Sequence, residues 1–213
     1  PLLEEKKEYK IDINQVVGKN KAIISIFAGS RVSEINTLMP IVLNFIKIMS
    51  KTYDNFTYVF HSNMEHNELI NSYIKDSDLS NCEVICDSQI KSHLLRKSIF
   101  AVVKSGTVSL EVCNAKIPSI IIYKTNLINF LIIKSLVKIK YVNIINIVAN
   151  DEIIPELLQS KCNSENIFKV VNTYLESPLK IKDQINKTEK IINILKTDSS
   201  SAKLASLAIN KFL

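Results

Sequence analysis

The 213-residue sequence contains no tryptophan, only three glycines and only five prolines. Such low glycine and proline contents exclude collagen-like, elastic and linker-dominated chains. Aromatic residues make up 7% of the chain, but hydrophobic residues make up 46%. That hydrophobic fraction is enough to bury a core and excludes intrinsic disorder. At roughly 150 residues per domain, the length predicts one domain with attached segments.

Cysteine is also scarce, and of the four cysteines only Cys82 and Cys86 lie close together in the sequence. This pair has no second pair and no histidine at zinc-finger spacing, so we expect no metal site. The pair falls in a short apolar run, where thiols are expected to be buried as small hydrophobic groups. No signal peptide opens the sequence, so we expect thiols rather than disulfides and a reducing cytosol.

The charge is only slightly unbalanced, with 27 basic and 21 acidic side chains and a formal net charge of +6. A basic excess favours a polyanion, an anionic membrane surface or a phosphorylated ligand. The lysines are scattered singly and no arginine-rich block is present, so we do not expect a nucleic-acid partner. The composition alone leaves open the alternative that the excess only keeps the surface soluble.

The longest apolar region, residues 117–148, is interrupted by four lysines and does not fit a transmembrane helix. Within it, residues 127–140 combine bulky apolar and basic side chains and fit an anionic membrane surface. A helix over 127–137 that is buried against a sheet fits the same pattern, and both alternatives stay open. The side chains concerned are Leu127, Phe130, Leu131, Lys134, Lys138 and Lys140.

Short β-branched runs alternate with segments of helical periodicity along most of the chain. Strands are predicted at 22–27, 57–60, 83–86, 99–103 and 119–123, and helices at 33–49, 65–74, 90–97, 108–115 and 127–137. This alternation predicts an α/β fold, a Rossmann-like parallel sheet with helices on both faces. Ser33 is the expected N-cap of the first helix, and Pro40 should bend that helix.

Beyond Pro155 the pattern becomes all-helical, with helices expected at 156–160, 165–175, 180–195 and 201–212. We therefore divide the chain into a connector (1–20), a Rossmann-like domain (21–160) and C-terminal helices (161–213).

Two predicted strand ends carry side chains suited to an anionic ligand, which binds beyond the carboxyl ends of strands in open α/β sheets. Residues 28–31 (AGSR) follow the first strand, where Gly29 permits a tight turn and Arg31 offers a planar fork to phosphate oxygens. Residues 104–107 (KSGT) precede a helix whose first N–H groups suit an anion, and Glu111 lies one turn further on. Each feature is also common as an ordinary turn, a helix cap or a surface charge. The spacing alone therefore leaves open the alternative that these residues have only structural roles.

The three histidines, His61, His66 and His93, stand at no spacing that pairs them with a serine or cysteine nucleophile. We expect them to be packing or surface residues.

Five segments carry a family resemblance in the same order and at matching spacing. They are 27–35 (FAGSRVSEI, against LPGSRxxEI), 104–111 (KSGTVSLE, against xSGTxxLE), 118–124 (PSIIIYK, against PxVVxYK), 141–149 (YVNIINIVA, against YVSLPNLLA) and 155–159 (PELLQ). These motifs resemble those of lipid-A-disaccharide synthase, a family 19 glycosyltransferase. The opening residues 1–4 (PLLE) also resemble the residues directly after that family's VGHP junction, so the likeness spans nearly the whole chain.

The resemblance implies one half of a GT-B glycosyltransferase, whose two Rossmann-like halves enclose the reaction. It implies transfer of 2,3-diacylglucosamine from UDP to 2,3-diacylglucosamine 1-phosphate, with inversion, giving lipid A disaccharide 1-phosphate and UDP. This chain corresponds to the C-terminal half, which binds the UDP-2,3-diacylglucosamine donor. The UDP-sugar is a substrate, so the family needs no cofactor. The implied place of action is the cytoplasm, peripherally on the inner face of the bacterial inner membrane.

The resemblance also carries substrate-contacting roles over to eight residues of this sequence. They are the diphosphate contacts Ser30 and Arg31, the nucleotide-pocket residues Ser105, Gly106 and Thr107, the ribose contact Glu111, and the donor-sugar residues Asn146 and Gln159. The family's catalytic base lies in its N-terminal half, so no catalytic residue is expected in this chain. Expected protein partners are that N-terminal half or a second copy of the chain.

Two departures from the family pattern are visible. Ile145 replaces the family's proline before Asn146, and residues 149–151 (AND) replace AGR, which removes an arginine. Two other functions stay open beside the synthase. They are a non-catalytic UDP-sugar binding or partner-interaction module and a UDP-sugar epimerase, which shares the fold and also needs a second half.

Overall fold

A computed structural model of the chain describes residue 17, residues 21–125 and residues 140–196, and shows a six-stranded sheet in the order β3-β2-β1-β4-β5-β6. Every neighbouring pair of strands is parallel. The strands are β1 (Ala22–Phe27), β2 (Phe56–His61), β3 (Cys82–Ile85), β4 (Ser98–Lys104), β5 (Ser119–Tyr123) and β6 (Glu156–Leu158). The predicted Rossmann-like parallel sheet is therefore confirmed.

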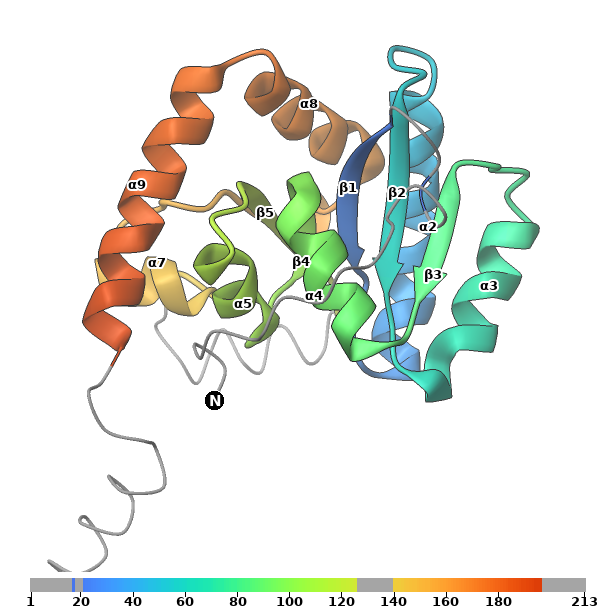
Figure 1. The fold of residues 1–213 in the computed structure, drawn as a ribbon, viewed down its shortest axis with the longest axis horizontal. Coiled ribbons are helices and arrows are strands. Elements are labelled where there is room, and N and C mark those ends of the chain that lie inside the picture. The colour runs from blue at the N-terminus through green and yellow to red at the C-terminus, as the bar shows by residue number, and fades with distance from the viewer. Residues whose placement is uncertain (1–16, 18–20, 126–139, 197–213) are drawn as a thin grey trace, which may run out of the picture.

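Apolar side chains project from both faces of the central strands, as expected for a parallel sheet that helices cover on each side. All six residues of β2 are buried, as are four of the six residues of β1. One core cluster joins the sheet to α2 (Val32–Met49), α3 (Asn67–Lys75) and α8 (Ser164–Leu175). In Figure 1, α2 lies behind the strands and α4 lies in front of them.

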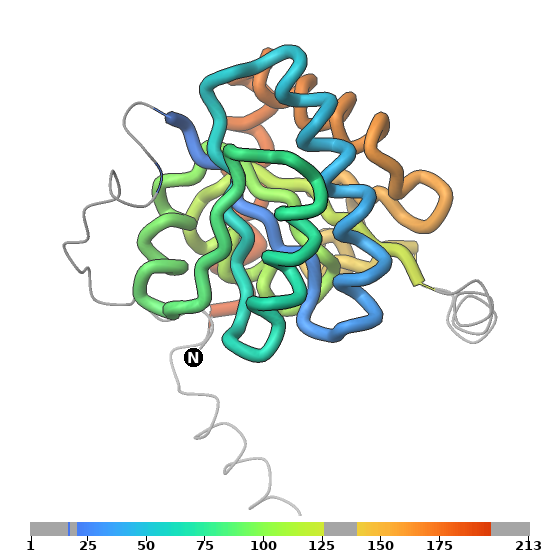
Figure 2. Tube along the Cα trace, turned by 90° about the vertical axis from the view of Figure 1, so that its right-hand side faces the viewer, coloured from blue at the N-terminus to red at the C-terminus, as the bar shows by residue number. Residues whose placement is uncertain are grey.

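A second core cluster joins the sheet to α5 (Val108–Asn114), α7 (Ile144–Ala149) and α9 (Pro178–Leu195). A small third cluster packs α4 (Ser88–Lys97) and Val17 against β1 and β2. The view in Figure 2, turned by 90°, shows the same helices arranged around the strands. The molecule is therefore a three-layered α/β unit built around one sheet.

Helix α2 is long and apolar enough to match a membrane span by length and composition. Eight of its eighteen residues are buried against the sheet, and Pro40 lies inside it at the expected position. Its predicted N-cap at Ser33 is wrong. The helix begins at Val32, and Arg31 occupies the N-cap position without a side-chain capping bond. The loop formed by residues 28–31 continues directly into the helix, so Ser33 already lies within the first turn of α2.

The predicted helix over 156–160 is also wrong, because β6 (Glu156–Leu158) and a 3-10 turn (Gln159–Lys161) occupy these residues. Leu157 pairs with Ile122 at the edge of the sheet. A short apolar run does not distinguish a strand from a helix, and here the open edge of β5 decides the outcome. The predicted helices at 127–137 and 201–212, and the connector at 1–20 apart from Val17, lie outside the described residues.

The other strands and the helices α2, α3, α4, α5, α8 and α9 agree with the sequence-based expectation to within a few residues, whereas α7 was not predicted. A 3-10 turn (Met64–His66) precedes α3, and Asp87 caps α4 by accepting from the N–H groups of Gln89 and Ile90. All four cysteines are free. Cys113 and Cys162 are buried, whereas Cys82 and Cys86 are only half-buried, contrary to expectation, because β3 is the edge strand.

One core side chain has an unsatisfied polar group. Tyr58 of β2 is fully buried with its ring edge-on to Phe45, and its hydroxyl has no hydrogen-bond partner among the described residues. Burial raises the pKa of this phenol. Tyr53 provides the contrast, since its hydroxyl donates to Asn172 Oδ1 at 2.6 Å.

We expect Tyr58→Phe to raise the free energy of unfolding by about 1 kcal/mol, because it removes a buried, unpaired hydroxyl. Tyr53→Phe removes a hydrogen bond and should lower it by about 0.5–1.5 kcal/mol. Urea unfolding followed by circular dichroism measures both variants. A loss of stability in Tyr58→Phe as large as that in Tyr53→Phe would show that the Tyr58 hydroxyl has a partner.

Candidate functional site

A cavity of about 1170 Å³ opens beside the carboxyl ends of the central strands. Strands β1 and β4 are neighbours in the sheet although β2 and β3 separate them in sequence, so the loops that follow them meet here. The cavity is also lined by residues after β2 and by side chains of α4, α5 and α9. Five of the eight residues that the family resemblance singles out line it: Ser30, Ser105, Gly106, Thr107 and Glu111.

The loop after β1 is held in a single shape at Ser30. The Ser30 N–H donates to Glu34 Oε2 at 3.0 Å, and the Ser30 carbonyl accepts from His66 Nε2 at 3.0 Å. Gly29 adopts a φ of +120°, and a Cβ at this position would lie 2.7 Å from Glu34 Cβ. Only glycine therefore allows Glu34 to approach the loop so closely.

Glu34 also holds the two cations nearest to this loop. Its Oε1 lies 3.0 Å from Arg31 Nη1 and 2.9 Å from Lys104 Nζ. Burial raises the pKa of this carboxyl, but the hydrogen bonds from Lys104 and Ser30 and the charge of Lys104 outweigh burial, so the pKa is lowered overall. The carboxylate is thus charged at neutral pH and links the β1 loop to the end of β4.

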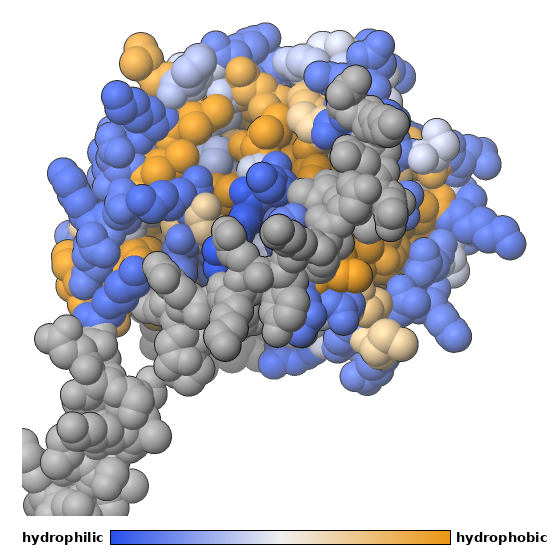
Figure 3. Space-filling view, in the orientation of Figure 1, coloured by the Kyte–Doolittle hydropathy of each residue, from blue (hydrophilic) through white to orange (hydrophobic). Residues whose placement is uncertain are grey.

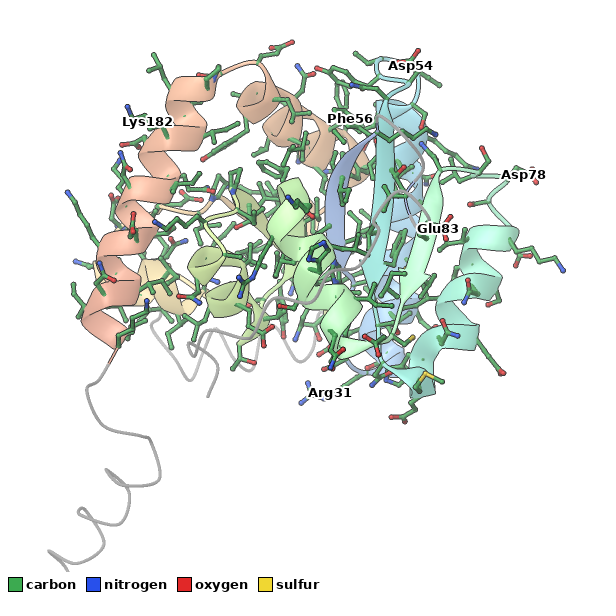
Figure 4. The ribbon with its side chains drawn as sticks, in the orientation of Figure 1. Arg31, Asp54, Phe56, Asp78, Glu83 and Lys182 are labelled. Atoms are coloured by element: carbon green, nitrogen blue, oxygen red, sulfur yellow. The ribbon has the colours of Figure 1, made fainter. Side chains whose placement is uncertain are left out.

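Arg31 and Lys104 differ in position. The Arg31 side chain is 75% exposed and is not part of the cavity lining, and Figure 4 shows it pointing away from the body of the molecule. The Lys104 side chain is only 18% exposed, lines the cavity, and places Nζ 5.6 Å from the centre of the Tyr123 ring. Of these two cations only Lys104 therefore lines the cavity, and the sequence-based prediction gave it no role.

The loop after β4 is tied to the segment before α7. The Ser105 hydroxyl donates to the Val142 carbonyl at 3.1 Å, and the Ser109 hydroxyl donates to the Gly106 carbonyl at 2.7 Å. Thr107 occupies the N-cap position of α5 without a side-chain capping bond. Its hydroxyl is therefore not used in capping, and Glu111 lies one helical turn further along, half-buried at the cavity wall.

Asn146 and Gln159 are not part of the cavity lining. The Asn146 amide is fully buried and ties α7 to the segment before β6, with bonds to both the N–H and the carbonyl of Ile154. Gln159 has a φ of +51°, and its Nε2 has no hydrogen-bond partner among the described residues. Their expected contacts with a donor sugar remain a prediction.

The lining of the cavity is rich in basic groups. It contains the five basic residues Lys91, Arg96, Lys104, Lys116 and Lys196 and the two acidic residues Glu111 and Glu189. On the face shown in Figure 3, strongly hydrophilic side chains gather over α4 between apolar patches. Within the described ranges, no group of three His, Cys, Asp or Glu residues could hold a metal ion. The arrangement suits an anionic ligand bound by N–H groups, hydroxyls and lysines.

Four residues of this site, Glu34, Lys104, His61 and His66, have no role in the sequence-based prediction. Glu34 and Lys104 stand inside the quoted motifs but carry no role there, and nothing in the sequence pairs them. His66 is a buried packing residue, as expected, and its Nε2 also donates a hydrogen bond to the Ser30 carbonyl of this site. His61 lines the cavity floor.

Because its pKa is lowered in the folded chain, Glu34 stabilises the fold above the ordinary glutamate pKa of 4.5. This contribution is lost as the pH falls through the lower, folded-state pKa. We expect Glu34→Gln to reduce the unfolding free energy by about 1 kcal/mol near neutral pH, since the carboxylate is partly exposed to solvent. The difference from the unmutated chain should be smaller at about pH 3 than near neutral pH, because protonation of the carboxyl in the folded chain removes this contribution.

Urea unfolding at the two pH values measures this difference. Glu176→Gln, at an exposed position after α8, is the matched control and should change stability at neither pH. A Glu34→Gln effect that is the same at both pH values would show that the charge of Glu34 does not stabilise the fold.

Comparison with known proteins identifies the family. The sequence profile of the family described as lipid-A-disaccharide synthetase matches residues 1–210. The lipid-A-disaccharide synthase of Rickettsia prowazekii (strain Madrid E) is 34% identical over 196 residues, which cover 92% of this chain and 49% of that protein. The synthase of Persephonella marina is 36% identical over 190 residues, which cover 88% of this chain and 49% of that protein. The chain spans about half the length of the curated relatives it matches.

Solved structures share the fold at low sequence identity. The C-terminal domain of a group 1 glycosyl transferase from Francisella tularensis has a TM-score of 0.54 at 14% identity, covering 88% of this chain and 93% of that one. UDP-GlcNAc 2-epimerase from Neisseria meningitidis, bound to UDP-GlcNAc, has a TM-score of 0.55 at 15% identity, covering 85% and 46%. These likenesses show a shared Rossmann-like α/β fold, of the kind found in one half of GT-B proteins. With its motifs at the ends of β1 and β4 and a profile match over nearly its whole length, the chain belongs to the lipid-A-disaccharide synthetase family.

Proposed function

We propose that this chain is the donor-binding half of a lipid-A-disaccharide synthase. The reaction transfers 2,3-diacylglucosamine from UDP to 2,3-diacylglucosamine 1-phosphate, inverts the anomeric centre, and releases UDP. The observation that carries the proposal is the cavity in which residues of the GSR and SGT motifs and Glu111 line one basic pocket. The donor diphosphate is placed at Ser30 and Ser105–Thr107 of this cavity, and its ribose at Glu111.

In the proposed reaction, the bond between the anomeric carbon and the β-phosphate oxygen breaks, and UDP leaves with an extra negative charge. Positioned cations and N–H donors stabilise such a charge without reorganisation at the moment of reaction. Lys104 is placed for this task because it already lies inside the cavity, at the end of β4. The acceptor hydroxyl must lose a proton to a base, and we assign that base to the other half of the enzyme, as the family resemblance implies.

Arg31 is proposed to join the diphosphate by exchanging partners. In the structure it shares Glu34 with Lys104 and is largely exposed, so its guanidinium can rotate toward the loop without leaving the carboxylate unpaired. A phosphate then replaces Glu34 as its partner, and a guanidinium fork binds phosphate oxygens in pairs. Ser30, the residue directly before Arg31, is the part of the same loop that lines the cavity.

We expect Arg31→Ala to weaken UDP binding by about 1.5–3 kcal/mol, the range for a charged hydrogen bond. Uridine binding should be nearly unchanged, because uridine has no phosphate. Isothermal titration calorimetry with both ligands measures the difference. Lys182→Ala, which removes a cation from the exposed side of α9, is the control and should alter neither affinity. Equal losses for UDP and uridine would remove Arg31 from the phosphate role.

We also expect the purified 213-residue chain to synthesise no disaccharide on its own. A glycosyl transfer needs a base within about 2.6–3.2 Å of the acceptor hydroxyl or one water away, and we place that base elsewhere. The assay supplies both acylated substrates in detergent and follows UDP release, with a full-length relative run in parallel. Product formed by the isolated chain would refute the assignment of the base. UDP binding without turnover, even when the other half is added, would favour the non-catalytic binding module.

The expected membrane-facing segment at 127–140 lies outside the described residues except for Lys140. Lys140 is exposed, and its Nζ lies 4.9 Å from the centre of the Tyr141 ring.

A further inference from the structure

His61 is a buried, titratable side chain that the proposed reaction does not use. It ends β2, is 8% exposed, and contributes to the lining of the cavity. Its ring stacks on Phe27 of β1, with centroids 4.4 Å apart and an angle of 14° between the planes. Phe27 also lines the cavity, so the two rings form part of its floor.

A chain of hydrogen bonds under this floor determines which ring nitrogen carries the proton. The Ser98 hydroxyl donates to the Leu94 carbonyl at 2.9 Å, because a carbonyl can only accept. The bond of 2.7 Å between the hydroxyls of Ser98 and Ser25 must then use the proton of Ser25. Ser25 Oγ therefore accepts from His61 Nε2, which lies 2.8 Å away. The neutral ring carries its proton on Nε2, and Nδ1 keeps its lone pair.

The surroundings of the ring keep it neutral. Burial lowers the pKa of His61 to about 3, with a further contribution from the charge of Lys91 on α4. Lys91 Nζ donates to the Ser62 carbonyl at 2.8 Å and so stays next to the ring. The groups beside the ring from β1 and β4, the Phe27 ring and the hydroxyls of Ser25 and Ser98, are neutral. At neutral pH, Nδ1 is consequently an acceptor and not a donor.

Nδ1 makes no hydrogen bond to any of the described residues, although the ring is fixed by stacking and by the Ser25–Ser98 chain. We propose that His61 presents Nδ1 to the cavity as a fixed hydrogen-bond acceptor for an O–H or N–H group of the bound nucleoside. This inference rests on the proposed function, because it takes the UDP part of the donor as the ligand. The group that it accepts from is either a ribose hydroxyl or the imide N–H of uracil.

The proposal makes His61 a specificity-determining residue. An acceptor held in place on a buried ring favours a ligand that supplies a donor at that point, and it disfavours one that supplies a second acceptor or a methyl group. Lys104, the Ser105–Thr107 loop and the Ser30 loop recognise the charge of a diphosphate, which all nucleoside diphosphates share. His61 supplies a contact that depends on the nucleoside itself.

Nitrogen-15 NMR of the full 213-residue chain, with labelled histidine, tests the inference directly. Only three histidines are present, and His66→Gln and His93→Gln variants assign their signals. We expect His61 to show a protonated Nε2 and an unprotonated Nδ1 at neutral pH. Saturating UDP should move the Nδ1 resonance upfield, as expected for a nitrogen that accepts a hydrogen bond. A proton on Nδ1, or an Nδ1 signal that saturating UDP leaves in place, would overturn the inference.

Ligand analogues separate a contact from a structural effect. His61→Met removes the acceptor, and it should weaken UDP binding about 2-fold to 10-fold, the range of one neutral hydrogen bond. Three analogues each lack one donor: 2′-deoxy-UDP, 3′-deoxy-UDP and N3-methyl-UDP. One of them should bind equally well to His61→Met and to the unmutated chain, which identifies the group that His61 recognises. The same loss for UDP and for all three analogues would show that His61 acts only through the fold.

A second variant keeps the test valid if His61→Met folds poorly. Ser25→Ala retains the imidazole but removes the acceptor that holds the proton on Nε2, so the ring can place its proton on Nδ1 instead. It should weaken UDP by a similar factor and leave the same analogue unaffected. An unchanged UDP affinity in Ser25→Ala would overturn the role of the hydroxyl chain. If the unmutated chain binds no UDP, judged by the amide signal of Gly106, the proposed function itself fails.

Discussion

The carboxylate of Glu34 joins the two loops on which the whole candidate site depends. It accepts from the Ser30 N–H in the β1 loop and forms ion pairs with Arg31 and Lys104, the last of which belongs to β4. A single carboxylate oxygen thereby lies within 3.0 Å of both cations, in the region where we propose that the diphosphate binds. Gly29 makes this possible, because any Cβ at its position would collide with the Glu34 side chain.

The sheet supplies the rigid frame for this contact. Because β1 and β4 pair in parallel, their carboxyl ends and the loops that follow them lie at the same edge, which is where open α/β sheets bind ligands. Toward the β6 side of the sheet, the Asn146 amide and the Glu156 carboxylate fasten α7 to the edge strand β6. Ser105 connects the two regions through the Val142 carbonyl. The positions of the segments around the cavity are therefore fixed by hydrogen bonds and ion pairs.

Charged and neutral groups of this cavity suit different parts of a nucleotide sugar. Lysines and the loop N–H groups suit the phosphates of a nucleotide sugar, whereas His61 is kept neutral by burial and by Lys91. A charged imidazole here would add one more cation without any preference among nucleotides, while a neutral one can select a hydrogen-bond donor. The chain belongs to the lipid-A-disaccharide synthetase family, and we propose that this cavity binds the donor of that reaction.

Local pattern in the sequence was enough to predict the parallel α/β fold, five of the six strands and the two motif loops, because periodicity and glycine placement act over a few residues. It failed at β6, where the short run 156–158 becomes a strand only because β5 offers an open edge. The tertiary structure alone decided that Lys104 rather than Arg31 lies in the cavity, that Asn146 is buried between α7 and β6, and that His61 carries its proton on Nε2. Each of these depends on partners far away in the sequence, such as Glu34 with Lys104 and Ser25 with Ser98, which no local pattern can bring together.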